Sequence, residues 1–197
     1  MEETTRGAQK LMGALRAFKI DLRGKTVLDI GSSTGGFTEV AFLYGAAKVV
    51  AVEKGTRQMR RALAADPRVE LHEKTDIFEF VPEEKPDVIV ADVSFLSLTK
   101  VLAYAKMELI GRHTVLVVML KPQFEVGDKD LVNGVIKNSR VQREVVKKFE
   151  EWLKRNGFVI LGKRDNEVRG RYGNTERFYY LRIHSSETLP NKFSRID

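Results

Sequence analysis

A glycine-rich loop follows a short apolar segment near the start of the chain. Residues 26–30 (TVLDI) are mostly β-branched or aliphatic and predict a strand, which runs into Gly31-Ser-Ser-Thr-Gly35-Gly36 and then into a helical stretch over 37–44. A strand, a glycine loop and a helix in this order bring backbone N–H groups and a helix N-terminus to one place. Glycines there let a ligand approach the backbone without meeting a Cβ atom. The loop therefore predicts a nucleotide-like ligand.

The loop differs from the dinucleotide-binding fingerprint, because Ser33 stands where that pattern has its second glycine. Glu53 ends the next predicted strand, about 20 residues later, where a carboxylate can accept from both ribose hydroxyls. Asp76 follows the third strand, where it can accept from an adenine amino group. An adenosine carrying an amino acid in place of a pyrophosphate fits these features, so we predict S-adenosylmethionine as cofactor. The predicted cofactor-binding residues are Gly31, Ser33, Gly35, Gly36, Phe37, Glu53, Asp76 and Asp92.

Charged residues also end the next two apolar segments. Asp92 ends the segment 87–92, and Lys121 follows the continuous apolar run 114–120. Ligands of parallel sheets bind outside the carboxyl ends of the strands, so both side chains are expected beside the cofactor. Methyl transfer from a sulfonium needs an aligned oxygen that loses its proton. A lysine can assist either as a base with a lowered pKa or as a cation that stabilises the developing alkoxide.

Strands alternate with helices along most of the chain, which predicts a mostly parallel sheet covered by helices on both faces. Two final apolar segments, 158–163 and 177–183, are expected to form an antiparallel edge pair. The polar segment 122–137 predicts a loop beside the site. Helices are expected over 37–44, 58–65, 98–109 and 139–156. The predicted organisation is one domain over 1–184, which includes an N-terminal helix over 6–20, and a flexible tail over 185–197.

The net charge of +7 is concentrated near the C-terminus. The stretch 137–182 holds 13 Lys and Arg against 6 Asp and Glu, so the remainder of the chain is neutral overall. A one-sided basic surface attracts polyanions, which favours a nucleic-acid partner. The predicted RNA-binding residues are Arg140, Arg143, Arg169 and Arg171. Phe124 and Tyr172 are candidates for stacking on a nucleotide that is flipped out of its helix.

The composition limits the other classes of function. There is no cysteine, which excludes disulfides and thiolate metal sites, suits a reducing cytoplasm and leaves no predicted metal centre. The first residues lack the features of a signal peptide, and no apolar run approaches the ~20 residues that span a bilayer. We therefore expect a cytoplasmic protein that does not bind membranes.

Five strings of residues resemble the TlyA family, the hemolysin-named group within the FtsJ-like ribose methyltransferases. They are 6–11 (RGAQKL), 28–38 (LDIGSSTGGFT), 91–99 (ADVSFLSLT), 120–125 (LKPQFE) and 173–176 (GNTE). The similarity extends from about residue 5 to about residue 183, and the second, third and fourth strings place the family's motifs on the predicted strand ends. The resemblance implies the Rossmann-like fold of class I S-adenosylmethionine-dependent methyltransferases, with a mostly parallel seven-stranded sheet.

The resemblance also implies a reaction and the residues that perform it. Members use a Lys-Asp-Lys-Glu tetrad for 2′-O-methylation of ribosomal RNA, which corresponds here to Lys10, Asp92, Lys121 and Glu176. We expect Lys121 to act on the hydroxyl, because a strand end holds it rigidly. Asp92 and Glu176 would orient the lysines, and Lys10 would hold the hydroxyl or a nearby phosphate. The implied partner is ribosomal RNA or a ribosomal subunit.

The sequence departs from the family pattern in two respects, and other functions stay open. Members usually carry an S4-type RNA-binding domain before the RGAQKL string, where this sequence has five residues, and many have Asn where Asp76 stands. One alternative is a methyltransferase for another substrate. However, residues 92–95 (DVSF) lack the Asn-Pro-Pro-Tyr-like pattern of nitrogen methylases. A second is a non-catalytic RNA-binding protein with the same fold. No strongly amphipathic basic helix supports a membrane-active hemolysin.

Overall fold

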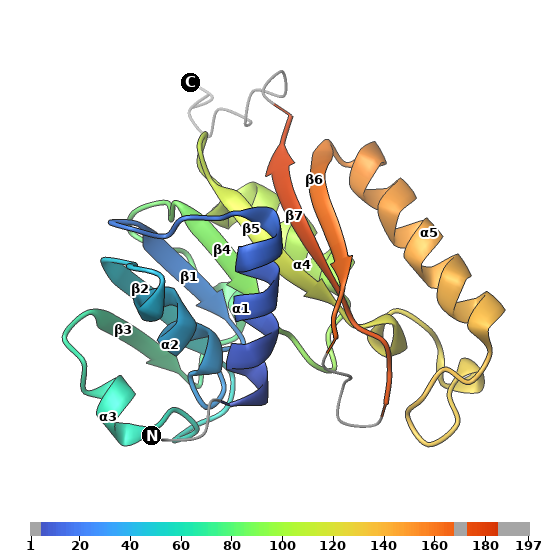
Figure 1. Cartoon of the computed structure of the whole chain (residues 1–197), viewed down its shortest axis with the longest axis horizontal. Coiled ribbons are helices and arrows are strands. Elements are labelled where there is room, and N and C mark those ends of the chain that lie inside the picture. Colours follow the sequence, from blue (N-terminus) through green and yellow to red (C-terminus); the bar gives the residue numbers. More distant parts are fainter. Residues whose placement is uncertain (1–4, 168–172, 185–197) are drawn as a thin grey trace, which may run out of the picture.

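The computed structural model describes residues 5–167 and 173–184, in which seven strands form one sheet between two layers of helices (Figure 1). The strand order is β3-β2-β1-β4-β5-β7-β6. Strands β1 to β5 are parallel, and β7 runs antiparallel to both β5 and β6. The strands are β1 (Thr26–Ile30), β2 (Lys48–Glu53), β3 (Val69–Glu73), β4 (Val88–Ala91), β5 (Val115–Leu120), β6 (Phe158–Asp165) and β7 (Arg177–Ile183). The predicted Rossmann-like architecture and its antiparallel edge pair are confirmed.

The helices divide between the two faces of the sheet. One face packs against α1 (Arg6–Phe18), α2 (Gly36–Leu43) and α3 (Arg61–Ala64). The other packs against α4 (Leu98–Tyr104), its π-helical continuation (Ala105–Leu109) and α5 (Ser139–Arg155). The helix expected over 58–65 is shorter than predicted, because the backbone at Arg60 is extended (ψ 133°) and the helix begins only at Arg61.

Apolar side chains explain both layers. The central strands are buried along nearly their whole length, as expected for parallel strands covered on both faces. In α5, Val145, Phe149 and Leu153 repeat every four residues and turn one stripe toward the sheet, while the basic residues of the helix face outward. On the opposite face, Leu11 and Leu15 of α1 are fully buried. The outer surface of α5 is therefore the part of the basic stretch best placed to meet a partner.

The glycine loop brings the ends of β1 and β4 into contact. Gly31 has φ +79°, a conformation that side chains disfavour, and a Cβ atom on it would lie 3.0 Å from the backbone oxygen of Asp92. The backbones after β1 and β4 therefore approach each other more closely than a side chain would allow. This contact places the predicted cofactor loop beside the predicted catalytic aspartate. The predicted domain boundary at 184 stays a prediction, since 185–197 lie outside the described residues.

Candidate active site

A cavity of about 530 Å³ opens at the carboxyl ends of β1 to β4. Its volume is within the range of small-molecule sites. The residues predicted to bind the cofactor that line this cavity are Gly31, Ser33, Glu53, Asp76 and Asp92. The strand ends predicted to carry a ligand thus surround one space.

The other three predicted cofactor residues face the protein instead of the cavity. Gly35 has φ +89° and forms the N-cap of α2, and Gly36 lies against α1. Phe37 is 4% exposed, and its ring lies 6.2 Å from that of Phe178 in the core. These residues support the glycine loop on the side away from the cavity. In this loop the cavity wall is made by Gly31 and Ser33.

Hydrogen bonds hold the carboxylate of Glu53 in the cavity wall. Its Oε2 accepts from the backbone N–H of Ser33 (3.0 Å), and its Oε1 accepts from Gly55 N (2.7 Å) and Gln58 Nε2 (3.3 Å). A carboxylate has about four lone-pair positions, so acceptor capacity remains for a ligand. Glu53 therefore joins the glycine loop to the end of β2 with a fixed orientation.

Asp76 lies three residues after the end of β3 and is kept ionised. Its Oδ1 accepts from Phe78 N (3.1 Å) at the start of a short 3-10 helix, and its Oδ2 accepts from Lys54 Nζ (2.9 Å). The hydrogen bond from Lys54, followed by that from Phe78, lowers the pKa of Asp76. An acceptor is thus present where the sequence predicts recognition of an adenine amino group.

Asp29 is a buried carboxyl group that the list of predicted site residues did not include. It is fully buried at the end of β1, where Thr38 Oγ1 donates to its Oδ2 (2.7 Å), while its Oδ1 has no hydrogen-bond partner among the described residues. Burial raises the pKa of Asp29 to about 7, and the nearby Asp92 and Glu53 add to that shift. An acid inside an apolar strand, 27–30, was the available signal.

The charges of the cavity select its ligand. Glu53, Asp76 and Asp92 line it, Asp29 lies behind it, and Lys54 is the only cation among its lining residues. A pyrophosphate would be repelled here, whereas a cationic ligand would be attracted. S-adenosylmethionine carries a sulfonium and an ammonium group, so the residues present fit it. Among the described residues, no cluster of three His, Asp or Glu side chains could hold a metal ion.

Lys121 and Asp92 form an ion pair at the edge of this cavity. Lys121 Nζ lies 2.6 Å from Asp92 Oδ1 and donates to Ser94 Oγ (2.8 Å). The side chains are 11% and 21% exposed, so the pair is largely shielded from water. Asp92 lines the cavity, and it therefore connects the predicted cofactor site with Lys121.

Lys10 and Glu176 form a second ion pair, which is buried. Lys10 Nζ lies 2.5 Å from Glu176 Oε2, with only 9% and 4% of the side chains exposed. Lys10 comes from α1, and Glu176 directly precedes β7. An isolated lysine on an amphipathic helix is usually a surface charge, and only the family resemblance, which implies that Glu176 orients the lysines, pointed to this partner.

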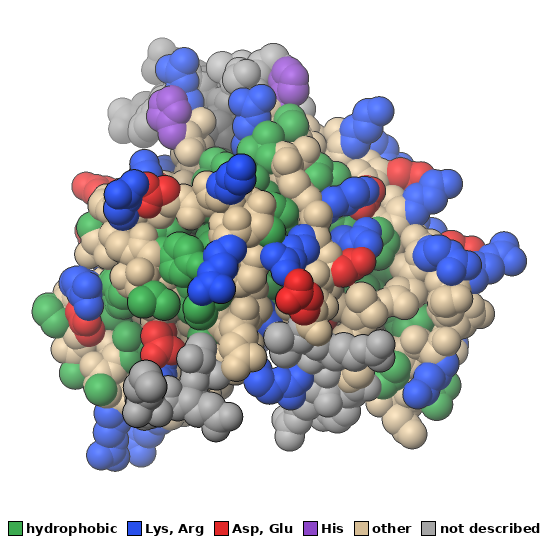
Figure 2. Space-filling model, in the orientation of Figure 1, with side chains coloured by type: hydrophobic (Ala, Val, Ile, Leu, Met, Phe, Trp, Pro, Cys, Tyr) green, Lys and Arg blue, Asp and Glu red, His purple; other side chains and the backbone are tan. Residues whose placement is uncertain are grey.

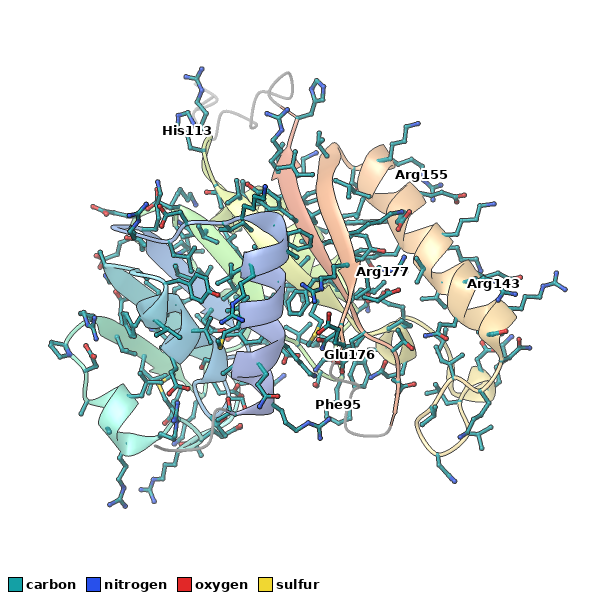
Figure 3. All side chains as sticks on the ribbon, viewed as in Figure 1. Phe95, His113, Arg143, Arg155, Glu176 and Arg177 are labelled. Carbon is teal, nitrogen blue, oxygen red and sulfur yellow. The ribbon has the colours of Figure 1, made fainter. Side chains whose placement is uncertain are left out.

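The strand register places the two ion pairs next to each other. Leu120 pairs with Arg177 at the end of the β5–β7 ladder, so Lys121 and Glu176 are the next residues on two adjacent antiparallel strands. Figure 3 shows Glu176 and Phe95 at the same end of the sheet. The four predicted catalytic residues thus form two neighbouring Lys–carboxylate pairs. Asp92 is the member of the four that reaches the 530 Å³ cavity.

Two of the four predicted RNA-binding arginines are described. Arg140 and Arg143 are exposed at the start of α5, where Arg140 Nε lies 3.0 Å from Glu144 Oε1 and Arg143 Nη1 donates to Ser139 Oγ (3.4 Å). Arg169 and Arg171 lie outside the described residues, as does Tyr172.

Phe95 is an exposed aromatic residue at the cavity, and the predicted site did not include it. It is 88% exposed, has φ +62°, and its ring lies 5.2 Å from that of Phe124. A non-glycine residue with a positive φ is strained, and such residues are common at functional sites, so Phe95 is a candidate site residue. The signal was its place three residues after Asp92 in the string 91–99.

The family model for FtsJ-like methyltransferases matches residues 4–183. The chain belongs to the FtsJ-like methyltransferase family. Methyltransferases of this family depend on S-adenosylmethionine, so the predicted cofactor is confirmed for this methyltransferase.

No described helix is both long and apolar enough to cross a bilayer.

Individual relatives agree with the family. The 16S/23S rRNA (cytidine-2′-O)-methyltransferase TlyA of Mycobacterium tuberculosis is 38% identical over 192 residues, which are 95% of this chain and 71% of the relative. A hemolysin-named protein of Lactococcus lactis is 34% identical, with a TM-score of 0.86 over 92% of this chain and 88% of the other. An S-adenosylmethionine-dependent methyltransferase from Listeria monocytogenes shares the fold at 16% identity, with a TM-score of 0.66 over 92% of this chain and 100% of the other. The resemblance to the TlyA family is confirmed.

Replacing Glu53 tests the assignment of the cofactor cavity. We expect Glu53→Ala to weaken S-adenosylmethionine binding about 10- to 100-fold, because each hydrogen bond to a charged group contributes about 1.5–3 kcal/mol. Titration calorimetry of the methyltransferase with the cofactor measures this. The control is Glu70→Ala, which removes a carboxylate from β3 that pairs with Lys48 and does not line the cavity. Unchanged affinity in Glu53→Ala would refute its role as a cofactor ligand.

Proposed function

We propose that this methyltransferase transfers a methyl group from S-adenosylmethionine to a ribose 2′-hydroxyl of ribosomal RNA. The observation that carries the proposal is the Lys121–Asp92 pair, which joins a charged lysine to the wall of the cofactor cavity. The name of the Mycobacterium tuberculosis relative, an rRNA cytidine-2′-O-methyltransferase, supports the choice of ribose and of ribosomal RNA.

Residues that line the cavity would hold the cofactor. Glu53 would accept from the ribose hydroxyls of the cofactor, Asp76 from its adenine amino group, and the backbone of Gly31 and Ser33 would lie against the amino-acid part. Bound there, the cofactor supplies an electrophilic methyl group on a positively charged sulfur. The carboxylates that line the cavity would balance that charge.

Lys121 would act on the hydroxyl that receives the methyl group. Because its Nζ donates to Ser94 and pairs with Asp92, we assign it the cationic role, in which it would stabilise negative charge on the hydroxyl oxygen. The O–CH₃ bond would form as the S–CH₃ bond of the cofactor breaks, and the hydroxyl proton would pass to solvent water. Asp92 would fix the direction of the lysine. The neighbouring Lys10–Glu176 pair would position the ribose or an adjacent phosphate. Alignment of this kind supplies several kcal/mol of barrier reduction.

The outer surface of α5 would bind the RNA backbone. Figure 2 shows Lys and Arg side chains along this helix, mixed with fewer carboxylates. Arg140 and Arg143 lie in its first two turns, which follow the loop after β5, so phosphates bound there would be close to the strand ends. Phe95, at the cavity, would stack on the base of the nucleotide being methylated.

Transfer of a tritiated methyl group tests the proposed function. The protein is incubated with labelled S-adenosylmethionine and purified small or large ribosomal subunits, and the RNA is digested to nucleosides. We expect label in 2′-O-methylated nucleosides, and mapping locates the position. Label on a base, or in protein, would contradict the ribose assignment. Cofactor binding without any transfer would favour a non-catalytic RNA-binding protein.

The salt dependence of RNA binding tests the role of α5. We expect the affinity for a fluorescent single-stranded ribosomal RNA fragment to fall steeply with salt, since each phosphate contact contributes a slope of about −0.7. Arg140→Gln combined with Arg143→Gln should reduce that slope by about 1.4. Arg155→Gln, at the opposite end of α5 (Figure 3), is the control and should change it less. A slope that the double substitution leaves unaltered would remove α5 from the RNA-binding surface.

A further inference from the structure

The loops that follow β4 and β5 are joined through Glu125. Its Oε1 accepts from the backbone N–H of Leu98 (2.5 Å), and its Oε2 accepts from Ser97 Oγ (2.7 Å). Ser97 and Leu98 lie in the loop after β4 and at the start of α4, whereas Glu125 ends the short 3-10 turn after β5. One carboxylate thus spans two segments that are 27 residues apart in sequence.

Two other contacts join the same loops closer to the cavity. The ring of Phe95 lies 5.2 Å from that of Phe124, and Lys121 Nζ donates to Ser94 Oγ (2.8 Å). The links run in order along both segments: Lys121 to residues 92 and 94, Phe124 to Phe95, and Glu125 to residues 97 and 98. Glu125 closes this series at the end farthest from the cavity.

The environment of Glu125 is unusual for a group that only caps a helix. Burial raises the pKa of this carboxyl, and the hydrogen bonds from Ser97 and Leu98 oppose the shift. The N-cap residue of α4, Ser97, forms no capping bond to the helix through its own side chain. A serine at this position usually caps its own helix. Here the Ser97 hydroxyl donates to Glu125. The acceptor for the backbone N–H of Leu98 at the start of α4 therefore comes from the loop after β5.

We propose that Glu125 is a positioning residue for methyl transfer, which holds the loop carrying Lys121 in register with the loop carrying Asp92 and Phe95. It does not touch the cavity, and it acts through the two loops. This inference rests on the proposed function, since it assigns Glu125 to the same reaction.

Kinetics of Glu125 variants test the proposal on large ribosomal subunits. We expect Glu125→Ala to lower kcat on the order of 10- to 100-fold, because small displacements of catalytic groups have effects of this size. The cofactor Kd should stay within about twofold, since the cofactor cavity does not include Glu125. Glu125→Gln should recover most of the loss, because an amide oxygen can still accept from Leu98 and its NH₂ can bond the Ser97 oxygen. Ser97→Ala should have little further effect when it is added to Glu125→Ala, because the acceptor of the Ser97 hydroxyl is then already absent.

Asp66→Ala is the matched control. Asp66 accepts from Arg68 N (2.9 Å) in the turn before β3, so its loss removes a comparable carboxylate-to-backbone bond far from the two loops. If Glu125→Ala and Asp66→Ala lower the melting temperature alike and neither changes kcat, Glu125 is only a cap and the proposal is overturned. Should Glu125→Ala not fold, Ser97→Ala, which removes the hydrogen bond to Glu125 Oε2, replaces it in this comparison, and unchanged kcat in Ser97→Ala would then overturn the proposal.

Amide hydrogen exchange gives a result that does not depend on RNA. In Glu125→Ala, we expect faster exchange at Leu98 and also over 93–97 and 121–124. Faster exchange at Leu98 alone would overturn the proposal, because the other contacts would then hold the loops without Glu125. If the wild-type protein methylates no ribosomal RNA, the proposed function fails, and this exchange measurement still decides whether Glu125 joins the loops.

Discussion

Lys121→Ala will abolish methyl transfer while leaving S-adenosylmethionine bound. Lys121 lies 2.6 Å from Asp92 Oδ1 at the edge of the cavity, but it does not line the cavity itself. Its loss therefore removes the cation beside the reacting oxygen without removing a contact to the cofactor. We expect kcat to fall about 10³-fold, within the range for loss of a group that stabilises charge in the transition state.

Single-turnover transfer to ribosomal subunits, together with calorimetry of cofactor binding, measures both parts of this prediction. Lys100→Ala, which removes an exposed lysine of α4, is the control and should have wild-type kinetics. Lys121→Arg should restore little activity, because a planar guanidinium does not reproduce the position of a lysine ammonium. Substantial turnover in Lys121→Ala would exclude the proposed role of this lysine.

Glu176→Ala will destabilise the fold strongly. It leaves the ammonium of Lys10 buried without its carboxylate, and breaking a buried ion pair from one side costs about 3–5 kcal/mol. Urea denaturation measures the change in the free energy of unfolding. Glu167→Ala, which removes an exposed carboxylate paired with Arg164, should cost less than about 1 kcal/mol.

The double variant Lys10→Met, Glu176→Leu separates stability from catalysis. Apolar residues of similar volume often replace a buried pair without loss of stability, so we expect this variant to unfold near the wild-type urea concentration. It should nevertheless be impaired in methyl transfer if the pair positions the RNA. A stable and fully active double variant would assign Lys10 and Glu176 to the fold alone.

The sequence predicted those features that depend on local patterns. Apolar segments that end in Gly31, Glu53 or Asp92 predicted the strands. They also predicted the edge of the sheet at which the cavity lies, because the carboxyl ends of parallel strands lie at the same edge. The helix expected over 139–156 is likewise present as α5, and its basic residues belong to the predicted basic stretch 137–182.

Features that depend on packing were not predictable in this way. The partner of Lys10 is 166 residues away. It becomes a neighbour only when α1 packs against the face of the sheet that includes Phe178 of β7. Phe37 was expected at the cofactor, but its side chain turns into the core, since residues at the start of a helix can point to either side of the loop. The exposure of Phe95 depends on a positive φ that no residue preference indicates.

The acidic lining of the cavity has a consequence for turnover. Glu53, Asp76 and Asp92 line the cavity and attract a ligand whose sulfur is positively charged. Once the methyl group has been transferred, that sulfur is neutral, while the carboxylates are unchanged. The demethylated cofactor is thus attracted to the cavity less strongly than S-adenosylmethionine is. The charges of the cavity therefore favour replacement of the product by a new S-adenosylmethionine molecule.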